Sequence, residues 1–225
     1  MEEWIFRVTA IAIPAILAIT LHEAAHGWMA SKLGDDTAWR LGRVTFNPLR
    51  HVDPFGTVIL PALMYFTTGF IFGWAKPVPV DFSRLRNPRR DMVWVALAGP
   101  GTNFLLALAS TFLWGFIDPQ GGLGFLWLKA MLEVSVLANV VLMVFNMIPL
   151  PPLDGGRVAV GLLPDALAFP LARLERYGIL ILIFALFLLP VIGRELGYDL
   201  NVFSWIVGPL VDYAIELMGF LTGNA

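Results

Sequence analysis

Two histidines and a glutamate stand close together in the apolar N-terminal part of the chain, in the order His22-Glu23-Ala24-Ala25-His26. Residues four apart lie on one face of an α-helix, so the imidazoles of His22 and His26 can bind one tetrahedral zinc ion. Glu23 is displaced from His22 by about 100° around such a helix, which places it near a water molecule on the ion without making it a ligand. Zinc lowers the pKa of that water to about 7, and a carboxylate can then accept its proton. The spacing therefore predicts a hydrolytic zinc centre.

The alternative is that these residues are structural. A histidine in a helix is more often a hydrogen-bonded core residue than a ligand, and this spacing also arises by chance. Here, however, the residues that precede the motif, 4–21, carry Arg7 as their only charge. Ionisable groups in an apolar, membrane-type helix are costly and usually functional, and a shared metal site gives all three side chains a reason to be there.

A catalytic zinc ion needs a third protein ligand and one open position. Asp154 follows the apolar run 123–148 and a group of prolines at 149–152 that cannot continue a helix. Gly155 and Gly156 come next and allow the backbone to turn sharply. Taken alone, Asp154 could simply cap the following segment. In combination with the two histidines, it is predicted to be the third ligand.

Other residues could have supplied that third ligand or a further site. A membrane protease of another type would use a downstream glutamate, and the candidates are Glu133, Glu175, Glu195 and Glu216. None of these stands in a comparable setting after a proline-rich break. His51 is the remaining histidine, and it is either a loop residue that pairs with Asp53 or a lipid phosphate, or a residue near the entrance of the site.

The composition indicates where this centre must lie. Hydrophobic residues make up 58% of the 225-residue chain and charged residues 14%, whereas soluble domains carry about 25% charged residues. A transmembrane helix needs roughly 20 apolar residues, and helices are predicted at about residues 4–33, 92–117, 123–145, 177–192 and 202–220. With no cysteine, disulfides and thiolate ligands are excluded. No basic stripe suggests nucleic acid. We therefore predict an all-α polytopic membrane protein with about five transmembrane helices.

One membrane-embedded domain over residues 1–225 is the simplest organisation, because no linker or repeat divides the chain. Its core is expected over residues 10–160, and the helices over 177–222 would be accessory. A loose alternation over residues 39–46, ending at Asn47-Pro48, predicts a short β-hairpin near the active site.

The run over residues 55–74 decides whether the ligands can meet. If it crosses the membrane, three crossings separate His26 from Asp154, and the two side chains lie about 30 Å apart. Pro61 and Gly69 can interrupt the run. We therefore predict a re-entrant segment, which enters the membrane and returns and must be shielded by protein.

Basic residues predict the orientation. Twelve of the fifteen Lys and Arg residues fall on the predicted face of the metal centre, and Arg7, Lys129 and Arg194 do not. The twelve are Lys32, Arg40, Arg43, Arg50, Lys76, Arg84, Arg86, Arg89, Arg90, Arg157, Arg173 and Arg176. Because cytoplasmic loops of membrane proteins are enriched in these residues, the active site is expected to face the cytoplasm. The basic loop 84–90 is interpreted as solvated and close to anionic lipid.

The two motifs together resemble the site-2 protease family of intramembrane zinc metalloproteases. HExxH near the end of one membrane helix is followed by Asn146-Met147-Ile148-Pro149-Leu150-Pro151-Pro152-Leu153-Asp154-Gly155 at the end of a later one. Four further stretches resemble compact bacterial and archaeal members: Gly42-Arg43-Val44-Thr45-Phe46-Asn47-Pro48, His51-Val52-Asp53-Pro54-Phe55-Gly56, Gly73-Trp74-Ala75-Lys76-Pro77-Val78-Pro79-Val80 and Ala98-Gly99-Pro100-Gly101-Thr102-Asn103. The resemblance covers roughly residues 10–160, and PDZ and CBS domains are not expected.

This resemblance implies specific roles. His22, His26 and Asp154 would bind one Zn²⁺ per chain, Glu23 would be the catalytic acid/base, and Asn146 would position the substrate or polarise its carbonyl. The expected reaction is hydrolysis of a peptide bond within or near a transmembrane segment of another protein, in a prokaryotic cell membrane. The segment would unwind and add as a strand to the edge over residues 39–46. The alternative is a zinc transporter or a zinc-binding protein without protease activity. Transport favours polar groups through the whole depth of the bundle, whereas the far half of residues 92–117 is polar only through Ser110 and Thr111.

Overall fold

A computed structural model describes residues 2–68, 73–118 and 120–224 of the chain. Helices account for all the regular secondary structure in these residues, which confirms the all-α prediction. Five helical stretches are long and apolar enough to cross a membrane. They are α1 (Glu2–Leu33), α4 (Pro88–Trp114), α5 (Leu123–Asn146), the continuous stretch Glu175–Glu195, and Phe203–Thr222, which ends in α10 (Gly208–Thr222). The positions match the five predicted runs.

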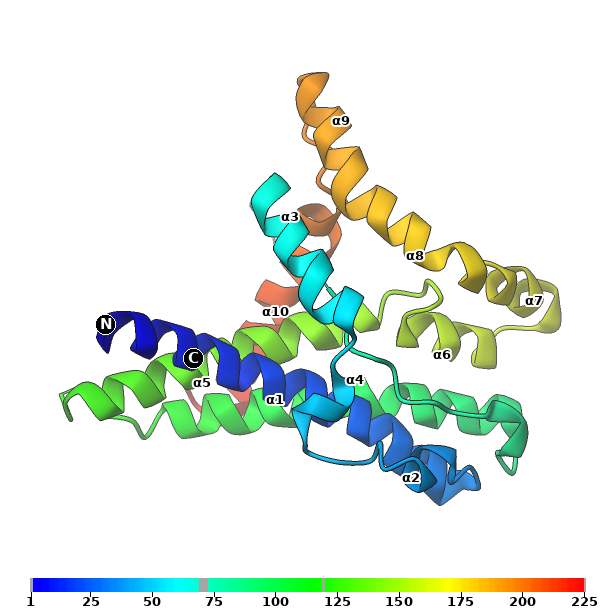
Figure 1. The fold of residues 1–225 in the computed structure, drawn as a ribbon, viewed down its shortest axis with the longest axis horizontal. Coiled ribbons are helices and arrows are strands. Elements are labelled where there is room, and N and C mark those ends of the chain that lie inside the picture. Colours follow the sequence, from blue (N-terminus) through cyan, green and yellow to red (C-terminus); the bar gives the residue numbers. More distant parts are fainter. Residues whose placement is uncertain (1, 69–72, 119, 225) are drawn as a thin grey trace.

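Three of these helices form the centre of the molecule. α1, α4 and α5 lie side by side along most of their length, and α10 packs against α4 and α5 (Figure 1). Small or β-branched residues line the contact between the last three, with Ala107, Val140, Val211 and Ala214 all almost fully buried. Helices approach each other closely where such small residues face one another. This packing holds α4 and α5 together, and each of them carries a buried asparagine described below.

The C-terminal end of α1, which is predicted to face the cytoplasm, is hydrogen-bonded to a later part of the chain. α1 ends before Gly34, whose φ of +119° is open only to glycine. Asp35 follows with no exposed surface and accepts hydrogen bonds from the backbone N–H and hydroxyl of Thr37 and from the backbone N–H of Asp81. Burial favours the neutral acid, but these hydrogen bonds outweigh it and hold the pKa of Asp35 below its ordinary value. An anionic side chain thus fixes the segment before Asp81 to the end of α1.

The predicted hairpin over residues 39–46 is wrong. The chain there forms the short helix α2 (Thr37–Arg40) and then turns. The backbone N–H groups of Gly42 and Arg43 bond back to the carbonyls of Trp39 and Ala38, so the segment satisfies itself locally. No strand occurs in residues 2–68, 73–118 or 120–224, and the proposed edge for strand addition is therefore not present in this segment. A loose alternation over eight residues does not distinguish a strand from a helical turn.

The predicted re-entrant segment is not supported either. Residues 54–68 form one helical stretch, the π-helix η2 (Pro54–Ile59) followed directly by α3 (Leu60–Thr68), which projects away from the bundle (Figure 1). Pro61 does not break this stretch: it lies at the junction where η2 passes into α3, and the chain is helical on both sides of it. Gly69, the other expected breaker, lies outside the described residues. Beyond the gap, Trp74 returns to the base of the stretch and donates its backbone N–H to the carbonyl of Gly56 at 3.0 Å.

Two helices between the third and fourth long stretches of the sequence were not predicted. They are α6 (Asp154–Leu162) and α7 (Asp165–Arg173), of which α6 packs against the N-terminal end of α4 (Figure 1). Pro164 separates them, because the residue before a proline disfavours the helical conformation. α6 matters for function, since its first residue is Asp154.

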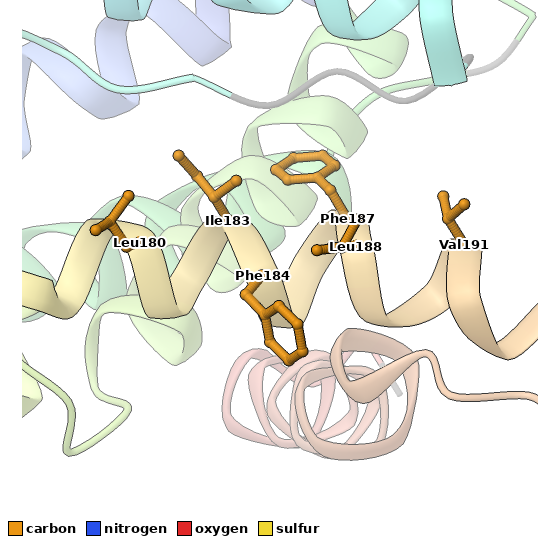
Figure 2. Close-up of a pocket in the computed structure, with 6 residues that line it drawn as sticks. All are labelled: Leu180, Ile183, Phe184, Phe187, Leu188 and Val191. Atoms are coloured by element: carbon orange, nitrogen blue, oxygen red, sulfur yellow. The ribbon is translucent and has the colours of Figure 1, made fainter.

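A pocket of about 340 Å³ lies on the stretch formed by α8 (Glu175–Ile183), η4 (Phe184–Leu188) and α9 (Leu189–Glu195). Figure 2 shows its lining, which consists of Leu180, Ile183, Phe184, Phe187, Leu188 and Val191. All six side chains are apolar, so the pocket offers no group for metal binding or proton transfer. It belongs to a helix that is exposed over most of its length, as expected for contact with lipid.

Candidate metal centre

The three predicted ligands meet at one point in the structure. His22 and His26 project from α1, and Asp154 projects from the start of α6. The Nε2 atoms of the two histidines are 3.1 Å apart, and the Oδ2 atom of Asp154 lies 3.2 Å from the first and 3.3 Å from the second. All three residues are buried, with 5–8% of their surface exposed. Among the described residues, these three form the group of metal-binding side chains that could hold an ion.

The hydrogen bonds on the far side of each imidazole assign the tautomers. His26 Nδ1 lies 2.7 Å from the backbone carbonyl of Val95, which can only accept, so Nδ1 carries the proton. His22 Nδ1 lies 2.6 Å from Asn103 Oδ1. The amide nitrogen of Asn103 donates to the backbone carbonyl of Ala18 and to the side-chain oxygen Oδ1 of Asn139, which leaves the Asn103 oxygen as the acceptor for His22. In their neutral form, which is the form that binds a metal, both imidazoles therefore direct the lone pair of Nε2 toward Asp154.

This arrangement fits a zinc ion. Two lone pairs and a carboxylate oxygen converge within 3.3 Å of one another, and no hydrogen-bond donor in the described part of the chain reaches Asp154 Oδ2. Such a cluster is unfavourable without a cation. Tetrahedral zinc has bonds of about 2.0–2.1 Å, so any two of its ligands are about 3.3 Å apart. The three atoms thus match three corners of one tetrahedron and leave the fourth open.

Close backbone packing brings Asp154 to this position. Asp154 is the first residue of α6, where the helix dipole favours a carboxylate. A Cβ on Gly155 would lie 2.2 Å from the carbonyl oxygen of Met147, and one on Gly156 would lie 2.2 Å from the backbone nitrogen of Pro151. Neither glycine has a positive φ. The two glycines are therefore needed for close approach of the helix to the loop after α5, and not for the sharp turn that the sequence suggested.

The other end of α6 is fixed to α4. The guanidinium of Arg89 donates to the carbonyls of Gly161 and Leu163 and forms an ion pair of 2.5 Å with Asp165. A cation at the end of a helix satisfies its unpaired carbonyls and stabilises its dipole. Arg89 belongs to the basic loop that was interpreted as solvated. Its contacts help to hold α6, which carries Asp154, against α4.

Glu23 lies on α1 beside this group and is partly buried. Its Oε2 atom accepts a hydrogen bond of 2.8 Å from the backbone N–H of Val78. Because it is next to His22 in the helix but is not part of the three-residue group, Glu23 matches the predicted position of a base that does not bind the metal. Asn146 is the last residue of α5, and its side-chain nitrogen donates to the carbonyl of Leu142 at 2.9 Å. This hydrogen bond does not test its predicted role in substrate positioning.

His51 does not pair with Asp53, one of the partners expected for it. Its side chain is buried, and its Nε2 atom lies 3.1 Å from the carbonyl oxygen of Thr45. Asp53, its expected partner, instead accepts hydrogen bonds from the backbone N–H groups of Phe55 and Gly56 at the start of η2. His51 therefore stabilises the loop after α2.

Two buried asparagines that support the ligand group were not identified from the sequence. Asn103 and Asn139 are fully buried in α4 and α5 and form a hydrogen-bonded chain that ends on His22. Groups that hydrogen-bond a metal ligand orient it and tune its affinity. A signal was available, because a polar residue inside a membrane helix is expected to have a function. Asn103 even ends one of the stretches that carry the family resemblance, but the sequence did not link it to His22.

A substitution at Gly99 tests how closely α4 packs against the two histidines. A Cβ at this position would lie 2.5 Å from His26 Nε2 and 2.6 Å from His22 Cε1. We expect Gly99→Ala to displace the histidines at a cost of about 1–3 kcal/mol, and so to weaken zinc binding about ten- to hundredfold. Competition with a chromogenic chelator measures this change. Gly101→Ala in the same helix is the control, because nothing lies within 4 Å of its Cβ. Equal zinc affinities for the two variants would contradict the observed contact.

Comparisons with known proteins identify the family. The chain is 36% identical over 213 residues to a Bacillus subtilis protein named "Putative zinc metalloprotease YwhC", covering 89% of this chain and 94% of that protein. It is 31% identical over 216 residues to "Putative zinc metalloprotease Rip2" of Mycolicibacterium smegmatis, covering 91% of this chain and 78% of that protein. The Rip2 protein of Mycobacterium tuberculosis strain H37Rv is 29% identical over 199 residues.

This chain belongs to the same family of zinc metalloproteases. No family model and no solved structure matches the chain. Membership agrees with the resemblance to site-2 proteases, and with five helices suited to a membrane it identifies the chain as a membrane zinc metalloprotease rather than a transporter. Zn²⁺ is accordingly the metal that the three-residue group is expected to hold.

Proposed function

We propose that this protein is an intramembrane protease that hydrolyses peptide bonds within or near transmembrane segments of other proteins, with zinc held by His22, His26 and Asp154. The observation that carries the proposal is the triangle of three ligand atoms, with sides of 3.1–3.3 Å, buried where two helices suited to a membrane meet α6. A soluble protease does not need a site at this depth. A buried site among apolar helices suits a substrate that is itself embedded in lipid.

Each side chain has a separate task in this proposal. Zinc, when bound, supplies a Lewis acid and lowers the pKa of water in the open position. Glu23 accepts the proton of the attacking water and passes it to the leaving amine, because it lies next to His22 and outside the ligand group. Asn103 and the Val95 carbonyl keep the histidines in the binding tautomer. Asn146 is proposed to position the substrate backbone, on the basis of the family resemblance.

The test is a cleavage assay with the purified protein in liposomes and a substrate that contains one transmembrane segment. We expect cleavage near that segment, its loss with a zinc chelator and its return with added zinc. Asn146→Ala should retain zinc and lose part of the activity, because it removes a positioning group and no ligand. Zinc movement into the liposomes without any cleavage would instead favour the transporter.

We further propose that the site opens toward the cytoplasm of a prokaryotic cell and that residues 1–225 act as one domain. The orientation is supported by the clustering of twelve basic residues on one predicted face of the membrane. Single cysteines introduced into this cysteine-free chain test the orientation. Cysteines at Leu41 and Arg86, both exposed, should react with a membrane-impermeant reagent only from the cytoplasmic side, and one at Gln120 only from the outside. Labelling of Leu41 and Gln120 from the same side would contradict this topology.

A further inference from the structure

An extended segment passes directly over the proposed catalytic base. Residues 73–81 form no helix after Trp74 rejoins the bundle, and Val78 lies near their middle. The backbone N–H of Val78 donates a 2.8 Å hydrogen bond to Glu23 Oε2, from a position 55 residues away in the sequence. The Val78 side chain is 8% exposed, so this contact is shielded from water. A hydrogen bond to a carboxylate is stronger than one between neutral groups, and more so when water is excluded.

The surface of α1 is shaped to receive this segment. Gly27 lies one helical turn after Glu23 on the same face. A Cβ at Gly27 would lie 2.9 Å from Val78 Cγ1 and 2.8 Å from Val44 Cγ2. Any side chain at this position would push the segment away from the helix. The glycine therefore allows Val78 to approach closely enough for its N–H group to reach Glu23.

A buried arginine holds the other side of the segment. Arg43 is 9% exposed, and its Nη2 atom donates to the carbonyl of Lys76 at 2.8 Å and makes a longer contact of 3.4 Å with that of Pro77. The N–H of Lys76 donates to the carbonyl of His51 at 2.8 Å. Prolines on both sides of Val78 restrict the backbone further. The position of the Val78 N–H group is thus fixed by several contacts.

We propose that Arg43 and the segment 76–78 are a positioning device for the catalytic carboxylate: Arg43 fixes the carbonyls of Lys76 and Pro77 so that the N–H of Val78 holds Glu23. This deepens the proposed function and rests on it. A glutamate side chain has three rotatable bonds, and one hydrogen bond to a rigid backbone removes much of that freedom. Efficient proton transfer needs a base within hydrogen-bond reach in the correct orientation, and small displacements of such a group can cost about 10²-fold in rate.

The first arm of the test removes the N–H group. Val78→Pro deletes this donor at a position whose backbone is already restricted by the following proline, and Val78→Ala keeps the donor while removing the side-chain packing. We expect Val78→Pro to lower kcat about 10- to 100-fold with KM and zinc content unchanged, and Val78→Ala to have a much smaller effect. Equal kcat values for the two variants would overturn the proposed role of the N–H group.

The second arm removes the guanidinium. Arg43→Met keeps the apolar stem but no donor, and it should lower kcat by a similar factor without loss of zinc. Arg43→Lys retains a cationic donor group, so its kcat should lie between those of Arg43→Met and the wild type. Arg50→Ala is the control, because Arg50 lies exposed in the same loop and should leave kcat unchanged. A rise in kcat or a fall in KM for Arg43→Met would mean that the segment covers the site, and would overturn the proposal.

A double-mutant comparison separates positioning from general damage. Glu23→Asp shortens the carboxylate side chain by one methylene, so it no longer reaches the Val78 N–H group. If Arg43 acts through Glu23, Arg43→Met should lower the rate much less in the Glu23→Asp background than in the wild type. The same loss in both backgrounds would mean that Arg43 stabilises only the fold. A wild type that cleaves no substrate contradicts the proposed function itself, whereas an active wild type with fully active Arg43→Met contradicts only the positioning device.

Discussion

Replacing Glu23 with glutamine is expected to lower peptide cleavage by at least about 10²–10⁴-fold, the range usually supplied by general acid–base catalysis. Glutamine keeps the size of the side chain but cannot accept a proton. The zinc content should stay near one ion per chain, since Glu23 lies outside the ligand group. Cleavage of a transmembrane substrate in liposomes and metal analysis of the same preparation measure both quantities.

The conservative variant makes this result interpretable. Glutamine can still accept the hydrogen bond from Val78, so the segment over residues 76–78 should stay in place and the protein should stay folded. Unfolding by heat should therefore occur at the wild-type temperature. Cleavage by Glu23→Gln at the wild-type rate would show that the proposed base takes no part in the reaction, even if zinc is required.

Removing any one of His22, His26 or Asp154 by substitution with alanine is expected to abolish cleavage and most of the bound zinc. Two remaining protein ligands cannot complete a stable site, because catalytic zinc is normally held by three. The loss of activity should be at least as large as that of Glu23→Gln, since the ion and the orientation of the water are lost together. Equilibrium dialysis against buffered zinc gives the change in affinity.

Suitable controls exist for these alanine variants. Asp118→Ala removes an exposed aspartate far from the ligand group in sequence and should bind zinc as the wild type does. Asp154→Asn keeps an oxygen atom in place but removes its charge, so it should bind zinc more weakly than the wild type and more tightly than Asp154→Ala. Stoichiometric, tightly bound zinc in Asp154→Ala would remove this residue from the metal site.

The group of His22, His26 and Asp154 could be predicted because each of these residues stands in a recognisable short pattern of the sequence. The spacing of His22 and His26 fixes both on one helix face, and the proline-rich break before Asp154 marks a ligand outside the helix. The long apolar runs likewise predicted all five membrane-type helices. Each of these patterns lies within a short stretch of the chain, whereas the link from Asp154 to the two histidines came from the need of a catalytic zinc ion for a third ligand.

The surroundings of the site could not be predicted, because they depend on contacts between distant residues. Asn103 lies 81 positions from His22, Val95 lies 69 from His26, and Val78 lies 55 from Glu23. No periodicity in a single sequence connects such pairs. Asn103 and Val78 lie in stretches that resemble the family, but the resemblance assigned neither residue a role.

The two failed predictions have a related cause. Residues 39–46 and 55–74 are short or interrupted, and weak local patterns do not decide between alternatives. The first stretch turns on itself around Gly42, which has a φ of +62°. In the second, Pro61 lies at the junction of η2 and α3, and the chain stays helical across it. The presence of a proline alone therefore does not decide whether a helix is interrupted.

X-ray absorption at the zinc edge tests the central claim most directly, because it reports the atoms bound to the metal in the intact protein. We predict a four-coordinate ion with two imidazole nitrogens and carboxylate oxygen, all at about 2.0–2.2 Å, and one further light atom in the open position. Glu23→Gln should give the same two-imidazole spectrum. A spectrum with fewer than two imidazoles, or a wild-type zinc content in Asp154→Ala, would contradict a zinc centre built from His22, His26 and Asp154.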